Sequence, residues 1–363
     1  MGKNITLKQL NELSTYDELY PAGAIDYTML TETTSVAYGV ENGTVKDALT
    51  GLYQYIHDLD VVKIKVVDVN NNPLPNIAAN GIIGSPQSGV DGVIKGVASS
   101  NSVTLVSPYV DTIKTKTVDV SKYKNTTRTL IVTMDSVADG TIVRYTSSQN
   151  VMFSNRVANI DVCCVGGGGA GGRGANASAS MGTLGAGGGG GGITNSFSVL
   201  VNVGTYYSII VGSGGAYTGG RNDGSNSSFG GLVIANGGKG VTFSSTMVSG
   251  GAAGSTGAGN GGSENSAGGA NTTLSEFNDG VTFYSGGGGG GVRLYSGGVA
   301  STNGGAPNGA SGAYVNMANY VVVKNATTAG IGGGGGAGGD QIVGGVGSSG
   351  GPGLVAIRIH LKS

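Results

Sequence analysis

Charge is scarce in this 363-residue sequence, which has 20 Lys and Arg, 21 Asp and Glu, and a formal net charge of −1. Phosphate binding needs clustered Lys and Arg, so the composition argues against nucleic acid as a main partner. The sequence also lacks an apolar stretch of about 18 residues or more, so we expect no insertion into a membrane. The start, MGKNITLKQLNE, lacks the apolar core of a signal peptide, and we expect synthesis in a cytoplasm without Sec export.

Cysteine and histidine are equally scarce, with two of each. Neighbouring strand residues point to opposite faces, so Cys163 and Cys164 are interpreted as two small buried residues and not as a disulfide or a metal site. His57 and His360 cannot be paired with a nucleophile by sequence, which argues against a Ser-His-Asp site. The strict Gly-Gly-x-Gly-x-Asp calcium repeat is absent. We therefore expect no metal and no cofactor.

Proline is rare too. Collagen needs strict Gly-X-Y triplets and many prolines, and this chain has seven prolines in irregular registers. Glycine, by contrast, is abundant: there are 74 glycines in the chain, roughly a fifth of it, against an average of about 7%. Only ten of them precede Val137. The chain therefore divides into an ordinary first part and a glycine-dominated remainder.

Residues 1–58 are predicted to be an attachment and oligomerisation segment. In the stretch NGTVKDALTGLYQYIHDLD, Thr44 can cap a helix and Asp47 places a negative charge in its first turn. An apolar stripe at helical spacing is formed by Val45, Leu49, Leu52 and Ile56. A helix of about 14 residues is marginal alone, so this stripe needs a partner. We favour self-association, as a trimer; packing on the following domain is the alternative.

Residues 59–136 are predicted to be a small β-sandwich. Val62, Ile64 and Val66 share one face of an expected strand, and further strands are expected at 103–106, 110–120 and 128–134. Short strands with a turn about every ten residues are typical of sandwiches. This part resembles the carboxypeptidase regulatory-like and Ig-like sandwich modules, which implies a spacer. The resemblance rests on Val66, Asp68, Pro73, Leu74, Asp91, Gly92, Val103 and Leu105.

Residues 137–363 hold glycine tracts framed by alternating apolar residues such as Ile160, Val162 and Cys164. Within the tracts glycine recurs with a period of three, as at Gly332 and Gly335, which is the period of the polyproline-II conformation. One interpretation is a flexible linker. The one we favour is a bundle of polyglycine-II helices, whose outward N–H and C=O groups bond to neighbouring helices. Its interior should be all glycine, and its loops should be held rigidly and free to vary.

The glycine-rich part also resembles a known family. The run IDVCCVGGGGAGG…GAGGGGGGI…GTYYSIIVGSGG…SSFGGLVIANGGKG…YSGGGGGGV…GIGGGGGAGG…GPGLVAIRIHL is similar to the glycine-rich receptor-binding domain of bacteriophage tail fibres. It is similar as well to the tail-tip adhesins of T-even-type phages, whose polyglycine-II sandwich carries variable host-recognition loops. The resemblance implies a protein of the virion tail. Its partners would be tail or baseplate proteins and a bacterial surface receptor, either a glycan or a surface protein.

The expected fold is therefore mainly β. It comprises a short N-terminal helical segment, a small Ig-like or carboxypeptidase-regulatory-like β-sandwich, and a C-terminal, β-framed polyglycine-II helix bundle. A helix and a sandwich of its own distinguish this chain from the T-even-type adhesins and favour a self-contained fibre protein.

Candidate receptor contacts are the aromatic, amide and charged residues of the loops between glycine tracts, because aromatic rings stack on sugar faces and Tyr loses little entropy on binding. The candidates are Tyr217, Arg221, Asn222, Asp223, Phe277, Asn278, Asp279, Tyr284, Arg293, Tyr295, Tyr314, Asn316, Asn319 and Tyr320. Phe229 and Phe283 are predicted to pack beneath the strands instead.

We expect a binding protein and not an enzyme. Two alternatives stay open. One is a tail-associated polysaccharide depolymerase, in which Asp223 and Asp279 would flank a glycosidic bond. The other is a purely structural or ice-binding glycine-rich protein.

Overall fold

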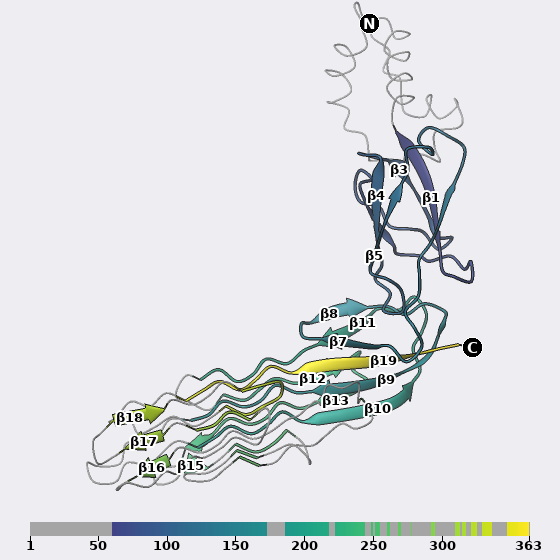
Figure 1. Ribbon diagram of the computed structural model, residues 1–363. Helices are drawn as coiled ribbons and strands as arrows, with labels where there is room; N and C mark the ends of the chain where they lie inside the picture. The colour runs from purple at the N-terminus through teal and green to yellow at the C-terminus, as the bar shows by residue number, and fades with distance from the viewer. Residues whose placement is uncertain are drawn as a thin grey trace, which may run out of the picture. The chain divides into compact units, whose positions relative to one another are not determined.

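The computed structural model divides between Val137 and Ala138 into two compact units (Figure 1). It describes residues 60–172, 186–217, 222–243 and 347–362, and the shorter segments 248–249, 251–254, 260–261, 268–269, 277, 292–294, 309–312, 314–316, 321–324 and 329–335. This described part is mainly β, and no helix in it is long and apolar enough to cross a membrane. The stripe predicted at Val45, Leu49, Leu52 and Ile56 lies outside the described residues.

The first unit contains two three-stranded sheets. In one, β1 pairs with β3 antiparallel and with β6 parallel; in the other, β4 lies between β2 and β5. The strands are β1 (Val61–Val67), β2 (Ala78–Asn80), β3 (Val93–Val97), β4 (Ser102–Val106), β5 (Thr115–Asp119) and β6 (Leu130–Thr133). The predicted alternation along β1 is confirmed, since Val62, Ile64 and Val66 are all fully buried.

Polar side chains shape the turns of this unit. The Asp68 carboxylate accepts the backbone N–H groups of Asn70 and Asn72, both at 2.8 Å, and so closes the turn after β1. The strand predicted over 110–120 is shorter than expected and begins only at Thr115. A local turn precedes it, in which the hydroxyl groups of Ser107 and Thr112 lie 2.6 Å apart.

Two four-stranded sheets, of order β10-β9-β19-β7 and β13-β12-β11-β8, frame the second unit (Figure 1). The strands are β7 (Ile142–Tyr145), β8 (Gln149–Val151), β9 (Val157–Val165), β10 (Ile193–Val199), β11 (Tyr207–Ile210), β12 (Ser227–Phe229), β13 (Val233–Ala235) and β19 (Leu354–Leu361). The antiparallel pair of β9 and β19 joins the two ends of the glycine-rich sequence, with Val165 opposite Leu354.

The two sheets face each other, because β12 contacts both β9 and β19. An aromatic cluster fills part of the second unit's core. The rings of Tyr207 and Phe229 stack at 5.2 Å between centroids, and Phe153 meets each of them edge-on. Such pairs contribute about 0.5–1.5 kcal/mol beyond the area that they bury. Phe229 is fully buried, which confirms that it is a packing residue.

Beyond the strands, glycine segments bond to one another through the main chain. Along segment 166–172, successive backbone N–H groups donate hydrogen bonds to three neighbouring segments, one after another. Every third residue therefore donates to the same neighbour. Segments 222–225 and 348–351 are two of these neighbours. The bonds to the third neighbour run from Gly166 to Gly192, from Gly169 to Gly189 and from Gly172 to Ala186, at 2.8 to 2.9 Å. The residue number of the acceptor falls by three each time the residue number of the donor rises by three. These neighbours therefore run antiparallel to segment 166–172.

Carbonyl groups of the same segment accept from three further segments. The donors to Gly167, Gly168 and Gly169 are the N–H groups of Gly238, Gly215 and Gly335. Among the residues that the structure describes, segment 166–172 thus has six hydrogen-bonded neighbours. Each bond contributes about 1 kcal/mol net, whereas ordering a residue costs about 1–2 kcal/mol. The segments are therefore stable only when they form together; we call this assembly the glycine lattice.

Close packing excludes side chains from most of the glycine lattice. A Cβ atom at Gly168 would lie 1.9 Å from the carbonyl oxygen of Gly333. The prediction that the interior is all glycine is nevertheless wrong, because Ala170 and Ala186 are fully buried. The methyl group of Ala186 fits because it packs against the side chain of Val241.

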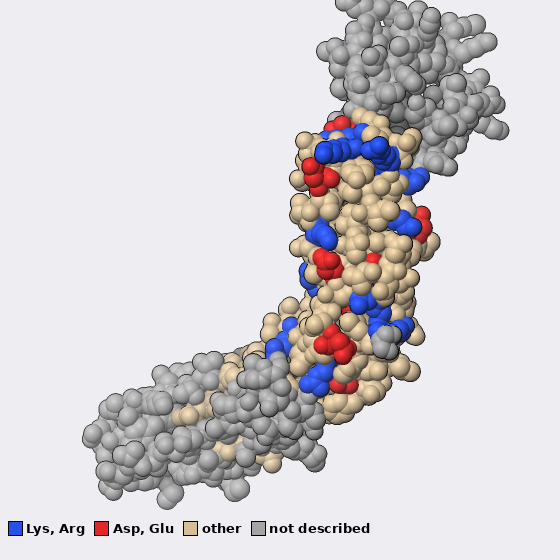
Figure 2. Space-filling model, turned by 45° about the vertical axis from the view of Figure 1, so that its right-hand side comes forward, with Lys and Arg blue, Asp and Glu red and all other residues tan. Residues whose placement is uncertain are grey.

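Five more short strands lie among the described residues: β14 (Thr242–Phe243), β15 (Val248–Ser249), β16 (Val292–Leu294), β17 (Tyr314–Asn316) and β18 (Val321–Lys324). The last three form a sheet, which we call the distal sheet, at the end of the glycine lattice away from β7 (Figure 1). Figure 2 shows basic and acidic side chains interspersed over the visible surface of the described residues.

Candidate functional site

Half of the residues predicted to contact a receptor are described. The other seven are Arg221, Asn278, Asp279, Tyr284, Tyr295, Asn319 and Tyr320, which lie outside the described residues. The described ones fall into three places: the edge of the glycine lattice, the distal sheet and the hydrophobic core.

Asn222 and Asp223 belong to the edge of the glycine lattice. The Asn222 carbonyl accepts the N–H of Ala170, and its side-chain amide donates to the carbonyl of Ala216 at 2.8 Å. The Asp223 carboxylate accepts the N–H of Gly240 at 2.8 Å and lies 3.0 Å from Lys239 Nζ. Both side chains therefore form hydrogen bonds with backbone groups at the edge of the lattice. These bonds give them a structural role.

Tyr217 lies at the same edge. Its side chain is half-buried, and its backbone N–H donates to Ser349 Oγ at 2.9 Å. Here the acceptor of the backbone N–H is a side-chain oxygen, whereas inside the lattice it is a backbone carbonyl oxygen. The chain position of Tyr217 is therefore fixed, although it lies in a connecting segment.

Arg293, Tyr314 and Asn316 lie in strands of the distal sheet, so the expectation that they are loop residues is wrong. Arg293 is in β16, opposite Val315 of β17. β16 pairs with β17 in parallel, and Tyr314 and Asn316 of β17 are paired with Val292 and Leu294 of β16. The fold thus brings three of the predicted residues onto two adjacent strands.

Phe277 is not a surface residue. Its ring is fully buried in a cluster with Cys163, Val165, Leu354 and Ala356, on the β9–β19 sheet. The prediction that Phe277 contacts a receptor is therefore corrected: it is a packing residue. Its aromatic character alone could not distinguish the two roles, since the same side chain suits a binding surface and a core.

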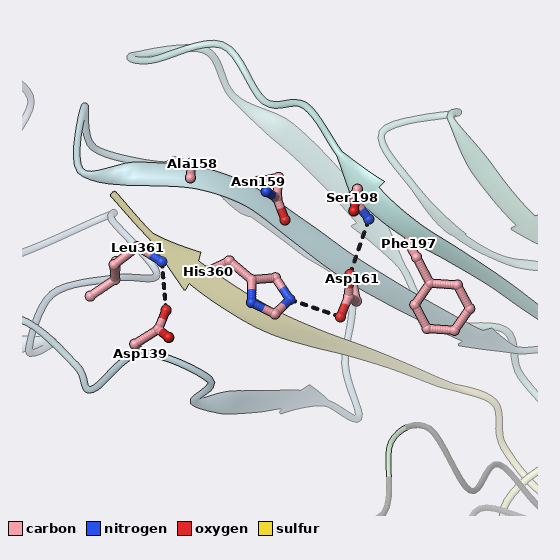
Figure 3. Close-up of a pocket in the computed structure, with 8 residues that line it drawn as sticks. All are labelled: Asp139, Ala158, Asn159, Asp161, Phe197, Ser198, His360 and Leu361. Atoms are coloured by element: carbon pink, nitrogen blue, oxygen red, sulfur yellow. Dashed lines mark hydrogen bonds and ion pairs between the residues drawn. The ribbon is translucent and has the colours of Figure 1, made fainter. Parts of the chain in front are cut away.

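An open hollow of about 530 Å³ is lined in part by residues of the same sheet (Figure 3). Residues from β9, β10 and β19 and from the segment before β7 line it. They are Asp139, Ala158, Asn159, Asp161, Phe197, Ser198, His360 and Leu361.

Asp161 is the centre of the polar contacts in the hollow. Its Oδ2 lies 2.8 Å from His360 Nε2 and 3.6 Å from Arg358 Nη1. Its Oδ1 accepts the N–H of Ser198 at 3.0 Å (Figure 3). Ser198 sits at an irregularity between β9 and β10 and has a φ of 54°, a region that serine rarely adopts. The carboxylate thus fixes an irregular strand edge and joins three strands.

The surroundings of Asp161 act on its pKa in opposite directions. Burial raises the pKa of this carboxyl group, while the hydrogen bonds from His360 and Ser198 and the charges of His360 and Arg358 lower it. The net effect is a pKa below the ordinary value. Asp161 is therefore ionised at neutral pH and acts as an acceptor.

The Asp161–His360 pair does not form a nucleophilic triad with Ser198. In such a triad the imidazole lies between the serine hydroxyl and the carboxylate, whereas here the carboxylate lies between His360 and the Ser198 backbone. Sequence reasoning missed this pair, because the register of β9 against β19 was not known. Within the described residues, no three His, Cys, Asp or Glu side chains are grouped so as to hold a metal ion.

Comparison with known proteins gives one finding. The model of a family described as a glycine-rich domain matches residues 144–360, which is more than half of the 363-residue chain. The matched region begins within β7 and ends within β19, so it includes both four-stranded sheets and the glycine lattice. No curated protein matches the chain.

Proposed function

The chain belongs to the glycine-rich domain family, and on that basis we propose that it is the receptor-binding protein of a bacteriophage tail fibre or of a phage-tail-like particle. It binds a bacterial surface receptor, a glycan or a surface protein, and it acts in the virion tail without catalysing a reaction.

The observation that carries this proposal is the hydrogen bonding of segment 166–172. Its N–H groups address three neighbours with a period of three, and three residues per turn is the repeat of the polyproline-II conformation. We therefore assign the glycine segments to polyglycine-II helices, each bonded to helices around it. Main-chain bonds and not a side-chain core hold such a scaffold, so connecting segments can change without repacking an interior.

The distal sheet is the surface that this scaffold would display to a receptor. Arg293, Tyr314 and Asn316 lie there, and their chemical types are common in binding surfaces. Several copies on one particle would add their weak single contacts into useful avidity.

The rest of the chain would place this surface. We assign the two three-stranded sheets of the first unit to an Ig-like or carboxypeptidase-regulatory-like sandwich that serves as a spacer. Residues 1–58 would attach the protein to the tail or baseplate and form a trimer through the stripe that contains Leu49 and Leu52.

Binding to cells tests the proposal. The full chain, labelled with a fluorophore, should bind some strains in a bacterial panel saturably and leave others unlabelled. Arg293→Ala should weaken binding severalfold if the distal sheet faces the receptor. Arg128→Ala, which changes an exposed arginine of the first unit, should leave binding unchanged. The absence of binding to every strain would overturn the proposal.

A depolymerase would leave a different trace. In the bound strains' surface polysaccharide we expect no new reducing ends after incubation with the protein. The Asp223 carboxylate already bonds to Lys239 and Gly240, which favours binding over catalysis. A turnover of polysaccharide would favour the enzyme.

A further inference from the structure

We propose that the hollow beside Asp161 and His360 is a second binding site, which takes a neutral sugar residue. The inference rests on the proposed function and adds to it a receptor class, an uncharged glycan, and a site away from the distal sheet. The volume of the hollow, about 530 Å³, falls within the usual range of small-molecule sites, about 300–1,000 Å³.

An aromatic ring forms one side of the site. Phe197 lines the hollow (Figure 3). Its exposed fraction is 49%. Its ring lies 6.3 Å from that of the buried Phe277, at an angle of 32°. Phe277 in turn lies 5.0 Å beneath the guanidinium carbon of Arg358. This support limits the motion of Phe197, so a sugar ring can pack its C–H face on it at little cost in side-chain entropy.

Polar groups face the same space. The Asn159 amide supplies donors and an acceptor, and it makes no hydrogen bond to any residue that the structure describes. In the neutral form of His360 whose Nε2 carries the proton and donates to Asp161 Oδ2, Nδ1 has the lone pair and can accept a hydrogen bond from a sugar hydroxyl. The Asp139 carboxylate uses Oδ1 to accept the N–H of Leu361 at 2.7 Å and retains acceptor capacity. Donors and acceptors beside an aromatic ring suit a molecule with hydroxyl groups and an apolar face.

Charge selects among sugars. Two carboxylates, Asp139 and Asp161, line the hollow, and Arg358 Nη1 lies 3.6 Å from Asp161 Oδ2. Asp139, Asp161, Arg358 and His360 together therefore carry no net positive charge, whether or not His360 is protonated. A carboxylate or phosphate on the ligand would be repelled by Asp139 and Asp161, and the Arg358 guanidinium is already paired with Asp161, so acidic sugars are disfavoured.

Ligand-observed saturation-transfer NMR on the full chain tests the site, with glucose, galactose, N-acetylglucosamine and glucuronic acid as probes. We expect transfer to at least one neutral sugar and at least tenfold weaker binding of glucuronic acid. Phe197→Ala should weaken binding of the neutral sugar at least tenfold, and Asn159→Ala severalfold. Leu200→Ala should not change it, since Leu200 is exposed and does not line the hollow. Circular dichroism checks that each variant is folded.

Two results would overturn the inference: no neutral sugar binds, or the Phe197 and Asn159 variants bind as the parent chain does. Measuring how the same proteins bind to cells distinguishes a failure of the sugar site from a failure of the proposed function. A parent chain and a Phe197→Ala variant that label cells equally refute the sugar site alone. A parent chain that labels no strain refutes the proposed function itself.

Discussion

His360 Nε2 lies 2.8 Å from Asp161 Oδ2, although the two residues are 199 positions apart in the chain. They belong to β19 and β9, whose antiparallel pairing connects the two ends of the glycine-rich sequence. The contact therefore joins the beginning and the end of the second unit, and the same carboxylate holds the irregular edge of β10 through Ser198.

Acid should destabilise the second unit through Asp161. Because the folded pKa lies below the unfolded one, the carboxylate stabilises the fold above the unfolded pKa of about 3.9. This contribution is lost as the pH falls through the folded pKa. Asp161→Asn should lower the free energy of unfolding by about 1–3 kcal/mol at pH 7, as measured by urea denaturation.

The difference between the parent chain and Asp161→Asn should shrink toward zero near pH 2. Asp135→Asn, which changes an exposed carboxylate paired with Lys116, serves as the control and should cost less than about 1 kcal/mol. If the difference in the free energy of unfolding between Asp161→Asn and the parent chain stays constant from pH 2 to pH 7, the ionised Asp161 carboxylate does not stabilise the fold as proposed.

One methyl group should disrupt the glycine lattice. Gly168→Ala places a Cβ 1.9 Å from the carbonyl oxygen of Gly333, and a backbone atom cannot move aside as a flexible side chain can. We expect a loss of more than about 3 kcal/mol, or failure to fold, measured by thermal and urea unfolding. Ala170→Gly, in the same segment, should cost only about 0.5–1 kcal/mol. Similar losses for the two variants would argue against close backbone packing.

The Asp223 carboxylate should matter for stability and not for receptor binding. Asp223→Ala removes the acceptor for the N–H of Gly240 and the partner of Lys239. We expect a loss of about 1 kcal/mol in the free energy of unfolding, with cell binding unchanged below the unfolding transition. Lys239→Ala, which removes only the exposed ion pair, should cost less than about 1 kcal/mol. If Asp223→Ala abolishes cell binding without loss of stability, its carboxylate contacts the receptor after all.

Cys164 should be inert in the folded protein. Burial raises the pKa of its thiol to about 12, which a backbone hydrogen bond at Phe229 only partly opposes. The thiolate is the reactive form, so iodoacetamide at pH 8 should label Cys164 only after denaturation. Mass spectrometry of peptides from native and denatured protein measures this. Rapid labelling of the native chain would show that β9 opens readily.

Composition and alternation predicted a good part of this fold. The buried face of β1, the packing role of Phe229 and the burial of Cys163 and Cys164 all agree with the structure. These predictions succeeded because they rest on local patterns, in which the period of the side chains alone tells which residues face inward. The spacing of three along the glycine tracts is local as well, and it reappears in the hydrogen bonds of segment 166–172.

Predictions about single residues succeeded less well. The sequence suggests a receptor contact at Phe277, which is buried, and a loop at Arg293, which lies in a strand. Residue type does not reveal which distant segment will cover a side chain, and the hollow beside Asp161 depends on four segments that meet only in the folded unit.

The sequence by itself determined that the second unit cannot rest on a side-chain core throughout, since glycine has no side chain to bury, and that the remaining apolar residues must form strands. Tertiary structure alone decided which segments bond to which, and hence that Asp161 meets His360 and that Phe277 supports Phe197. The physical reason is that main-chain hydrogen bonds are the same for every glycine, so the pairing of segments follows from the geometry of the whole assembly.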